Sequence, residues 1–127
     1  MLGDNISTYS MRNLGGKGVV AATFITWDDV DDDGDIDLGE ELMAMDIVHN
    51  STVKWGTDTF QPKGRWFDVQ GVGAHEVGHA FGMDHTGNFH EEDFVQTMFA
   101  LVSSKDTSLW TLEFDGDVLG IRFLYGP

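Results

Sequence analysis

The segment HEVGHAFGMDH, from His75 to His85, limits the possible fold more strictly than any other part of the chain, and it holds three of the five histidines. In a helix, residues four positions apart share a face, so His75 and His79 can direct their ring nitrogens at one point. Gly82 can adopt the left-handed conformation that ends a helix, and the reversed chain then brings His85 back toward that point. The pattern predicts a helix followed by a sharp reversal, with three imidazoles gathered beside the carboxylate of Glu76.

Three neutral imidazole nitrogens that leave a fourth position for water are the ligands of a catalytic zinc ion. We therefore predict a zinc site formed by His75, His79 and His85. Zinc lowers the pKa of a bound water to about 7, and Glu76 stands where it can take the proton and pass it to a leaving amine. The extended pattern HExxHxxGxxH, with glycine at the break, argues against surface histidines placed by chance. A zinc site without activity would fit the same residues.

Composition restricts the kinds of partner and site. The chain has no cysteine, so nitrogen and oxygen atoms must hold any metal, and neither disulfides nor a catalytic thiol is possible. A net charge of -15 argues against nucleic acid or an anionic membrane as a partner.

With 127 residues, 41% of them hydrophobic, we expect one domain spanning residues 1–127. No apolar run has the length of a membrane span, and the first ten residues do not resemble a signal peptide, so we expect a soluble chain. Neither composition nor charge indicates an oligomeric state.

Two segments have the composition of strands. Residues 19–27, VVAATFITW, are rich in β-branched and aromatic side chains. Residues 42–49, LMAMDIVH, suit a helix or a strand by pattern, and their last residues favour a strand. We interpret residues 1–18 as an irregular N-terminal segment with at most a short strand, and residues 50–65 as a long surface loop.

Two segments have the composition of helices. Asp68 is a suitable N-cap for a helix over residues 69–81, and a second helix is predicted over residues 112–125, where apolar side chains form one stripe. The first helix contains three glycines, each of which costs roughly 1 kcal/mol of helix propensity. Close packing against neighbouring backbone would explain Gly71, Gly73 and Gly78.

HEVGHAFGMDH resembles the zinc-binding signature of the metzincin metalloproteases, and Thr86 after the third histidine is closest to the matrixins. QTMFA resembles the Met-turn of that clan, which would place Met98 beneath the zinc site; a plain core methionine is the alternative. The tail TLEFDGDVLGIRFLYGP is similar to the C-terminal matrixin helix. The matching residues are Asp117, Val118, Gly120, Ile121, Leu124, Tyr125 and Gly126.

The resemblance, which runs from about Val19 to the end, implies an α+β metzincin-like catalytic domain. Its expected parts are a twisted mixed sheet, an active-site helix and a C-terminal helix, with an abbreviated N-terminal part because the family's first strand and long first helix have no counterpart before residue 19. It also implies a small prokaryotic-type matrixin-like zinc endopeptidase that acts outside the cell.

In matrixins an extended peptide or protein substrate adds to an unpaired sheet edge by backbone hydrogen bonds. By resemblance, the candidate edge strand is Asp46, Ile47, Val48, His49 and Asn50. The wall of the adjoining pocket should lie near residues 99–103. The sequence departs from the usual matrixin pattern at two points near this pocket. Residues 88–96 must form a bulge or small insertion, and the proline that normally follows the Met-turn is absent.

The second chemical signal is DVDDDGDIDLGE, residues 29–40, which fits a twelve-residue EF-hand-type calcium loop with glycine at the sharp turn. The candidate ligands are Asp29, Asp31, Asp33, Asp35, Asp37 and Glu40. The flanking sequence does not favour two helices, so we expect an isolated calcium-binding connection between two strands; a solvated acidic loop is the alternative. A calcium-dependent binding or scaffold module with a non-catalytic zinc site is therefore the second functional hypothesis.

Overall fold

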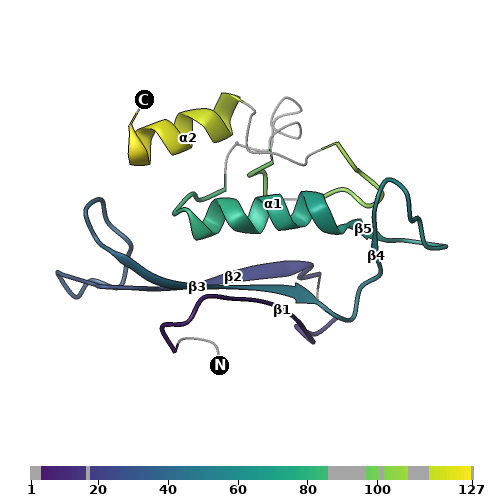
Figure 1. The fold of residues 1–127 in the computed structure, drawn as a ribbon, viewed down its shortest axis with the longest axis horizontal. Coiled ribbons are helices and arrows are strands. Elements are labelled where there is room, and N and C mark those ends of the chain that lie inside the picture. Colours follow the sequence, from purple (N-terminus) through teal and green to yellow (C-terminus); the bar gives the residue numbers. More distant parts are fainter. Residues whose placement is uncertain (1–3, 17, 86–96, 101, 109–114, 127) are drawn as a thin grey trace.

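The computed structural model describes residues 4–16, 18–85, 97–100, 102–108 and 115–126 of the chain. Its elements are β1 (Thr8–Arg12), β2 (Ala21–Trp27), β3 (Leu42–Asn50), β4 (Trp55–Gly56), β5 (Phe67–Asp68), α1 (Val69–Ala80) and α2 (Asp115–Tyr125). α1 lies along one face of the sheet formed by β1, β2 and β3, and α2 lies beyond α1 (Figure 1). None of the helices in these ranges combines the length and apolar composition that crossing a bilayer requires.

The main sheet is mixed, as expected for an α+β fold. β3 is its central strand: β1 pairs with it in parallel, and β2 pairs with it antiparallel. The prediction that Asp46, Ile47, Val48, His49 and Asn50 form an edge strand is therefore wrong. All five lie in β3 opposite residues 8–12 of β1, and β2 reaches as far as His49 on the other side. Among the strands that the structure describes, β1 and β2 are the edge strands of this sheet.

β1 is the short strand that the sequence allowed within residues 1–18. Thr8–Arg12 form a regular strand whose partner lies 38 residues further along the chain. The Thr8 hydroxyl donates a hydrogen bond to the buried Asp46 carboxylate, and the Tyr9 hydroxyl lies 3.3 Å from Nε2 of His49. These tertiary contacts order a segment whose own composition is weakly strand-forming.

The core lies between the sheet and α1, where the helix approaches the strands closely. A Cβ atom added at Gly73 would stand 2.8 Å from the Tyr9 hydroxyl oxygen, and one added at Gly78 would collide with Sδ of Met98. Close packing thus explains these two glycines, although the contacts are with side chains and not with the neighbouring backbone that was expected. The N–H of Gly71 donates to the Asp68 carboxylate at 2.7 Å and completes the predicted N-cap, a contact that does not itself require glycine.

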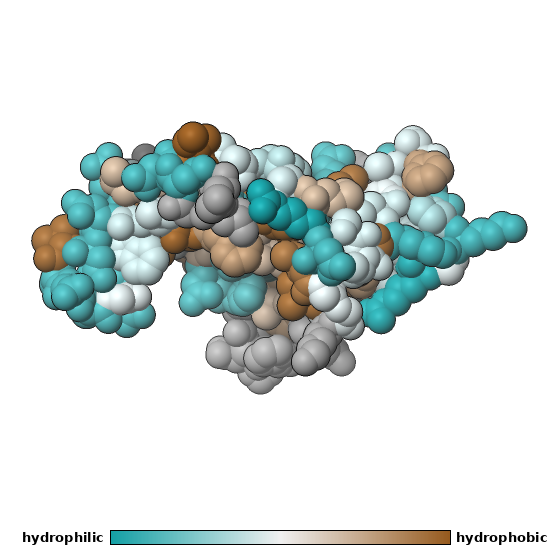
Figure 2. Space-filling view, turned by 90° about the horizontal axis from the view of Figure 1, so that it is seen from below, coloured by the Kyte–Doolittle hydropathy of each residue, from teal (hydrophilic) through white to brown (hydrophobic). Residues whose placement is uncertain are grey.

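The remaining boundaries differ slightly from the expected ones. α1 ends at Ala80, with Phe81 as its C-cap, and α2 is described from Asp115 onward; residues 112–114 lie outside the described ranges. The expected surface loop over residues 50–65 contains the short strand β4, which pairs in parallel with β5. The acidic connection between β2 and β3 projects at the left of Figure 1, and Figure 2 shows it as mostly hydrophilic, whereas apolar side chains gather near the middle of the same face.

Candidate active site

The C-terminal part of α1 and the turn after it position the three histidines of the signature. His75 and His79 project from the same face of α1. Gly82 has a φ of +86°, and its N–H donates to the His79 carbonyl at 2.8 Å, so the chain reverses there. The reversal returns His85 to the other two rings, as the glycine in the sequence predicted.

The Nε2 atoms of the three rings converge on one point. They are 3.1 Å apart between His75 and His79, 3.1 Å between His79 and His85, and 3.2 Å between His75 and His85. Nitrogen ligands at about 2.0–2.1 Å from a tetrahedral zinc ion are roughly 3.3 Å apart. The three rings are therefore spaced as one bound zinc ion requires.

Backbone carbonyls fix the protons on two of these rings. Nδ1 of His75 lies 2.6 Å from the Thr97 carbonyl oxygen, and Nδ1 of His79 lies 2.7 Å from that of Met83. Because a carbonyl oxygen only accepts, each Nδ1 carries the proton and each Nε2 presents a lone pair. No proton lies between the Nε2 atoms of His75 and His79, so their close approach is not a hydrogen bond. Facing lone pairs are stable around a cation, and the residues thus fit a metal ion.

The protonation of the rings agrees with this role. Burial lowers the pKa of His75 to about 4, against a smaller upward effect of its hydrogen bond to the Thr97 carbonyl. The pKa of His85 is also lowered, first by burial and then by His79. Both rings are consequently neutral at pH 7, as imidazole must be to bind a metal.

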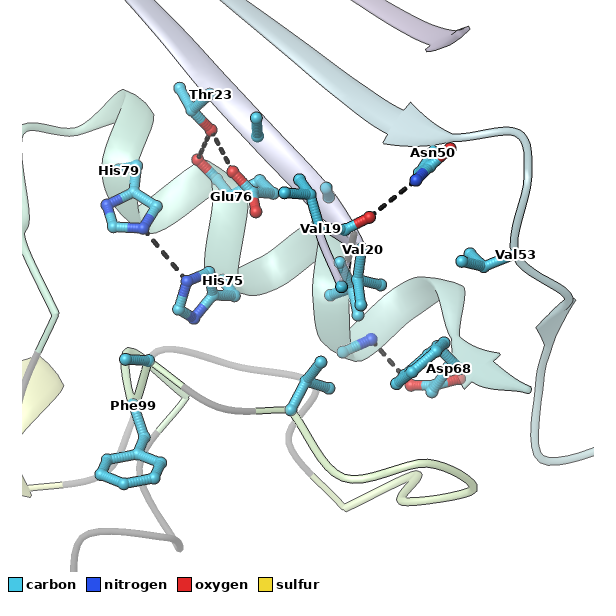
Figure 3. A pocket seen from close by; sticks show the side chains of 18 of the residues that line it. Val19, Val20, Thr23, Asn50, Val53, Asp68, His75, Glu76, His79 and Phe99 are labelled. Atoms are coloured by element: carbon cyan, nitrogen blue, oxygen red, sulfur yellow. Dashed lines mark hydrogen bonds between the residues drawn. The ribbon is translucent and has the colours of Figure 1, made fainter. Parts of the chain in front are cut away.

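Glu76 follows His75 in sequence and points from α1 toward Thr23 on β2 (Figure 3). Its side chain is only 5% exposed, and Oε2 accepts a hydrogen bond of 2.6 Å from the Thr23 hydroxyl. Glu76 does not belong to the group of histidine nitrogens that could share an ion, yet it lines the same open cleft of about 1030 Å³. A buried carboxylate beside the metal ligands can exchange a proton with a water in the cleft.

A family comparison bears directly on this geometry. The model of the matrixin family matches residues 10–126. The chain belongs to the matrixin family. No match was found among solved structures. As a matrixin the chain is a metalloprotease, and the zinc ion that its family implies fits the three histidine nitrogens.

In this matrixin, Met98 is fully buried against Gly78 of α1, and its place in a Met-turn beneath the zinc site stays a prediction. The carboxylate of Asp117, at 0% exposure, accepts the backbone N–H groups of Thr97 at 3.1 Å and Met98 at 3.0 Å. Because the Thr97 carbonyl orients His75, Asp117 links α2 to a candidate zinc ligand. Thr86 and residues 88–96, which also entered the sequence predictions, lie outside the described residues.

Sequence reasoning missed the contacts of Thr23 and Asp117. Asp117 was noted only as part of the matrixin-like tail, and a charged residue at the start of an apolar helix was the available signal. Thr23 is a polar residue in the otherwise apolar run AATFITW, which on its own is compatible with an ordinary strand position.

The acidic connection brings most of its candidate calcium ligands together. Oxygens of Asp29, Asp31 and Glu40 form one group within 4.8 Å of one another, and Asp31, Asp33 and Asp37 form a second. Asp35 is in neither group, as expected for the EF-hand position that binds through its backbone carbonyl. The Asp33 carboxylate is the main cause of a raised pKa at Asp37. The negative charges are thus close enough to repel one another.

Proposed function

We propose that this matrixin is a zinc-dependent endopeptidase in which His75, His79 and His85 hold the zinc. The observation that carries the proposal is the convergence of three Nε2 atoms beside an open cleft. When bound, zinc supplies a Lewis acid that polarises a peptide carbonyl and lowers the pKa of water to about 7. The protein supplies the cleft, the orientation of the ligands and the proton transfer.

Glu76 is proposed as the general base and acid. Its carboxylate takes a proton from the attacking water as the water oxygen joins the carbonyl carbon, and delivers that proton to the amine nitrogen as the peptide C–N bond breaks. The position of Glu76, in the cleft but outside the ligand group, supports this role. Its low exposure also strengthens its electrostatic interactions, because the local dielectric is low.

We propose that the substrate strand adds to residues 21–25 of β2, in place of the edge assigned to residues 46–50. Among the described strands β2 pairs only with β3, so its other edge is open to a peptide. This part of β2 lines the cleft with the histidines, and Phe99, Ala100 and Val102 line it too. Main-chain pairing gives affinity with little sequence preference, so selectivity would come from the pocket near residues 99–103.

Removing the metal tests the zinc proposal. The purified chain should contain about one zinc per molecule and cleave a quenched fluorescent peptide. A chelator should abolish cleavage, and added zinc should restore it, since the three histidines alone do not activate water. Elemental analysis and the cleavage rate measure both effects. A chain that binds calcium but shows no zinc-dependent hydrolysis would favour the alternative, a calcium-dependent binding or scaffold module.

We further propose that residues 29–40 bind calcium and stiffen the connection between β2 and β3. Asp29 accepts the N–H groups of Asp33 and Gly34, and Glu40 accepts those of Val30 and Asp37, so the loop is already curled around its carboxylates. Gly34 has a φ of +85°, as the sharp turn needs. We also propose that the protein acts outside the cell, as is typical of matrixins. Calcium sites of extracellular proteins are weak, and a Kd of about 10⁻⁴–10⁻³ M would suit this loop.

Replacing Glu40 by Gln is expected to weaken calcium binding by at least about tenfold, because a bidentate carboxylate at the last loop position is lost. Isothermal titration with calcium measures the change. Glu41→Gln is the matched control, since Glu41 is the exposed next residue and stands outside the loop motif. If the wild-type chain takes up no calcium at millimolar concentration, the loop is a solvated acidic connection.

A further inference from the structure

Thr23 is in contact with the proposed general base from across the interface between sheet and helix. It lies on β2 opposite Ile47, on the face that α1 covers. Its Oγ1 is 2.6 Å from Oε2 of Glu76 and 2.9 Å from the backbone carbonyl oxygen of the same residue. Both contacts are drawn in Figure 3, which shows Thr23 and Glu76 pointing toward each other.

We infer that Thr23 is a positioning residue for Glu76: its hydroxyl holds the carboxylate in the orientation that proton transfer requires. The inference rests on the proposed endopeptidase function and adds a residue to its machinery. Within the described part of the chain, the Thr23 hydroxyl provides the one hydrogen bond to the Glu76 carboxylate.

The energetics favour a specific role for this contact. A glutamate side chain loses rotamer freedom when it is fixed, and a buried carboxylate without a partner is costly. A hydroxyl donor at 2.6 Å to a carboxylate is in the range of strong, charge-assisted hydrogen bonds. The neighbouring residues of β2 on the same face, Ala21 and Ile25, are apolar and offer no donor. The hydroxyl of Thr23 therefore selects one orientation of Glu76 among several.

The pairing of Thr23 with Glu76 can persist during the reaction. A hydroxyl has one proton to donate and two lone pairs that accept. While Glu76 is charged, the hydroxyl donates to its carboxylate. After Oε1 of Glu76 has taken a proton from water, Oε2 still has lone pairs, so the hydroxyl can continue to donate to it, and the Glu76 carbonyl offers a second acceptor. Only Oε2 is engaged, so Oε1 remains to exchange the proton with water.

Three substitutions on β2 test this inference. Thr23→Val keeps the size and branching of the side chain but removes the donor, and we expect kcat to fall about ten- to hundredfold with KM within about twofold. Thr23→Ser keeps the hydroxyl and should retain kcat within about threefold. Thr26→Val, the same change three residues along and so on the opposite face, should behave as wild type. Zinc content should be the same in all three.

Two further measurements distinguish a positioning role of Thr23 from an effect of the substitution on the general stability of the protein. In a Glu76→Gln background, Thr23→Val should cause no additional loss of kcat, because the two residues act as a unit. In crystal structures of the zinc-loaded proteins, the Glu76 side chain should leave its wild-type position in Thr23→Val while His75 and His79 stay in place. Wild-type kcat in Thr23→Val, an effect on KM alone, or an unmoved Glu76 would overturn the inference. If the zinc-loaded wild type does not cleave peptides, the proposed function fails, and the crystal structures still decide whether Thr23 holds Glu76.

Discussion

Glu76→Gln is expected to lower kcat for peptide cleavage by about 10²–10⁴-fold while zinc stays bound. Glutamine has nearly the same shape as glutamate, and its amide oxygen can still accept the hydrogen bond from Thr23, so the fold and the three histidines should be undisturbed. What the amide lacks is the ability to take a proton from water and return it to the leaving amine. Steady-state kinetics on a quenched peptide, together with elemental analysis, measure the two quantities.

The control for this substitution is again Glu41→Gln, which makes the same chemical change at an exposed position just before β3. It should leave both kcat and zinc content at wild-type values. If Glu76→Gln retained kcat within about threefold, Glu76 would not be the general base. Loss of zinc from Glu76→Gln would instead show that the carboxylate supports metal binding.

Asp117→Ala is expected to lower the free energy of unfolding by about 3–5 kcal/mol, the largest effect on stability that we predict. The fully buried carboxylate accepts two backbone N–H groups, and alanine would leave both without an acceptor in the core. Because the same turn presents the Thr97 carbonyl to His75, zinc affinity should also fall, by about tenfold. Urea unfolding of the zinc-loaded protein and competition with a chelator measure these changes.

Two variants test whether the loss of stability comes from the Asp117 carboxylate. Asp117→Asn keeps one oxygen acceptor and should lose less stability than Asp117→Ala. Asp58→Ala removes an exposed carboxylate from the loop between β4 and β5 and should change the free energy of unfolding by less than about 0.5 kcal/mol. A loss below about 1 kcal/mol in Asp117→Ala would mean that water or a neighbouring group replaces the carboxylate at the two N–H groups.

The site draws on segments far apart in the chain. α1 supplies His75 and His79, the reversal at Gly82 supplies His85, β2 supplies Thr23, and α2 supplies Asp117. The three site histidines belong to one segment of eleven residues, whereas Thr23 lies 53 residues before Glu76 and Asp117 lies 19 residues after Met98. The histidines were therefore accessible to sequence reasoning, and the groups that hold Glu76 and the turn at Met98 were not.

Features that depend on neighbours within a few residues could be predicted from the sequence alone. The start of α1 after Asp68, its end near the left-handed Gly82, and the meeting of the three imidazoles all follow from helical spacing and capping. The strand character of residues 21–27 follows from side-chain composition in the same way, whereas residues 42–49 suited a helix or a strand by pattern and only their last residues favoured the strand.

The order of the strands and the partners of the buried polar groups became known only from the folded structure. The composition of β3 indicates a strand but does not say whether both of its sides are paired, and its neighbour β1 lies 38 residues earlier in a segment with little strand character. This is why residues 46–50 were expected at an edge and lie at the centre. Hydrogen bonds between strands, and those of Thr23 and Asp117, join residues that chain folding brings together, so local sequence patterns do not specify them.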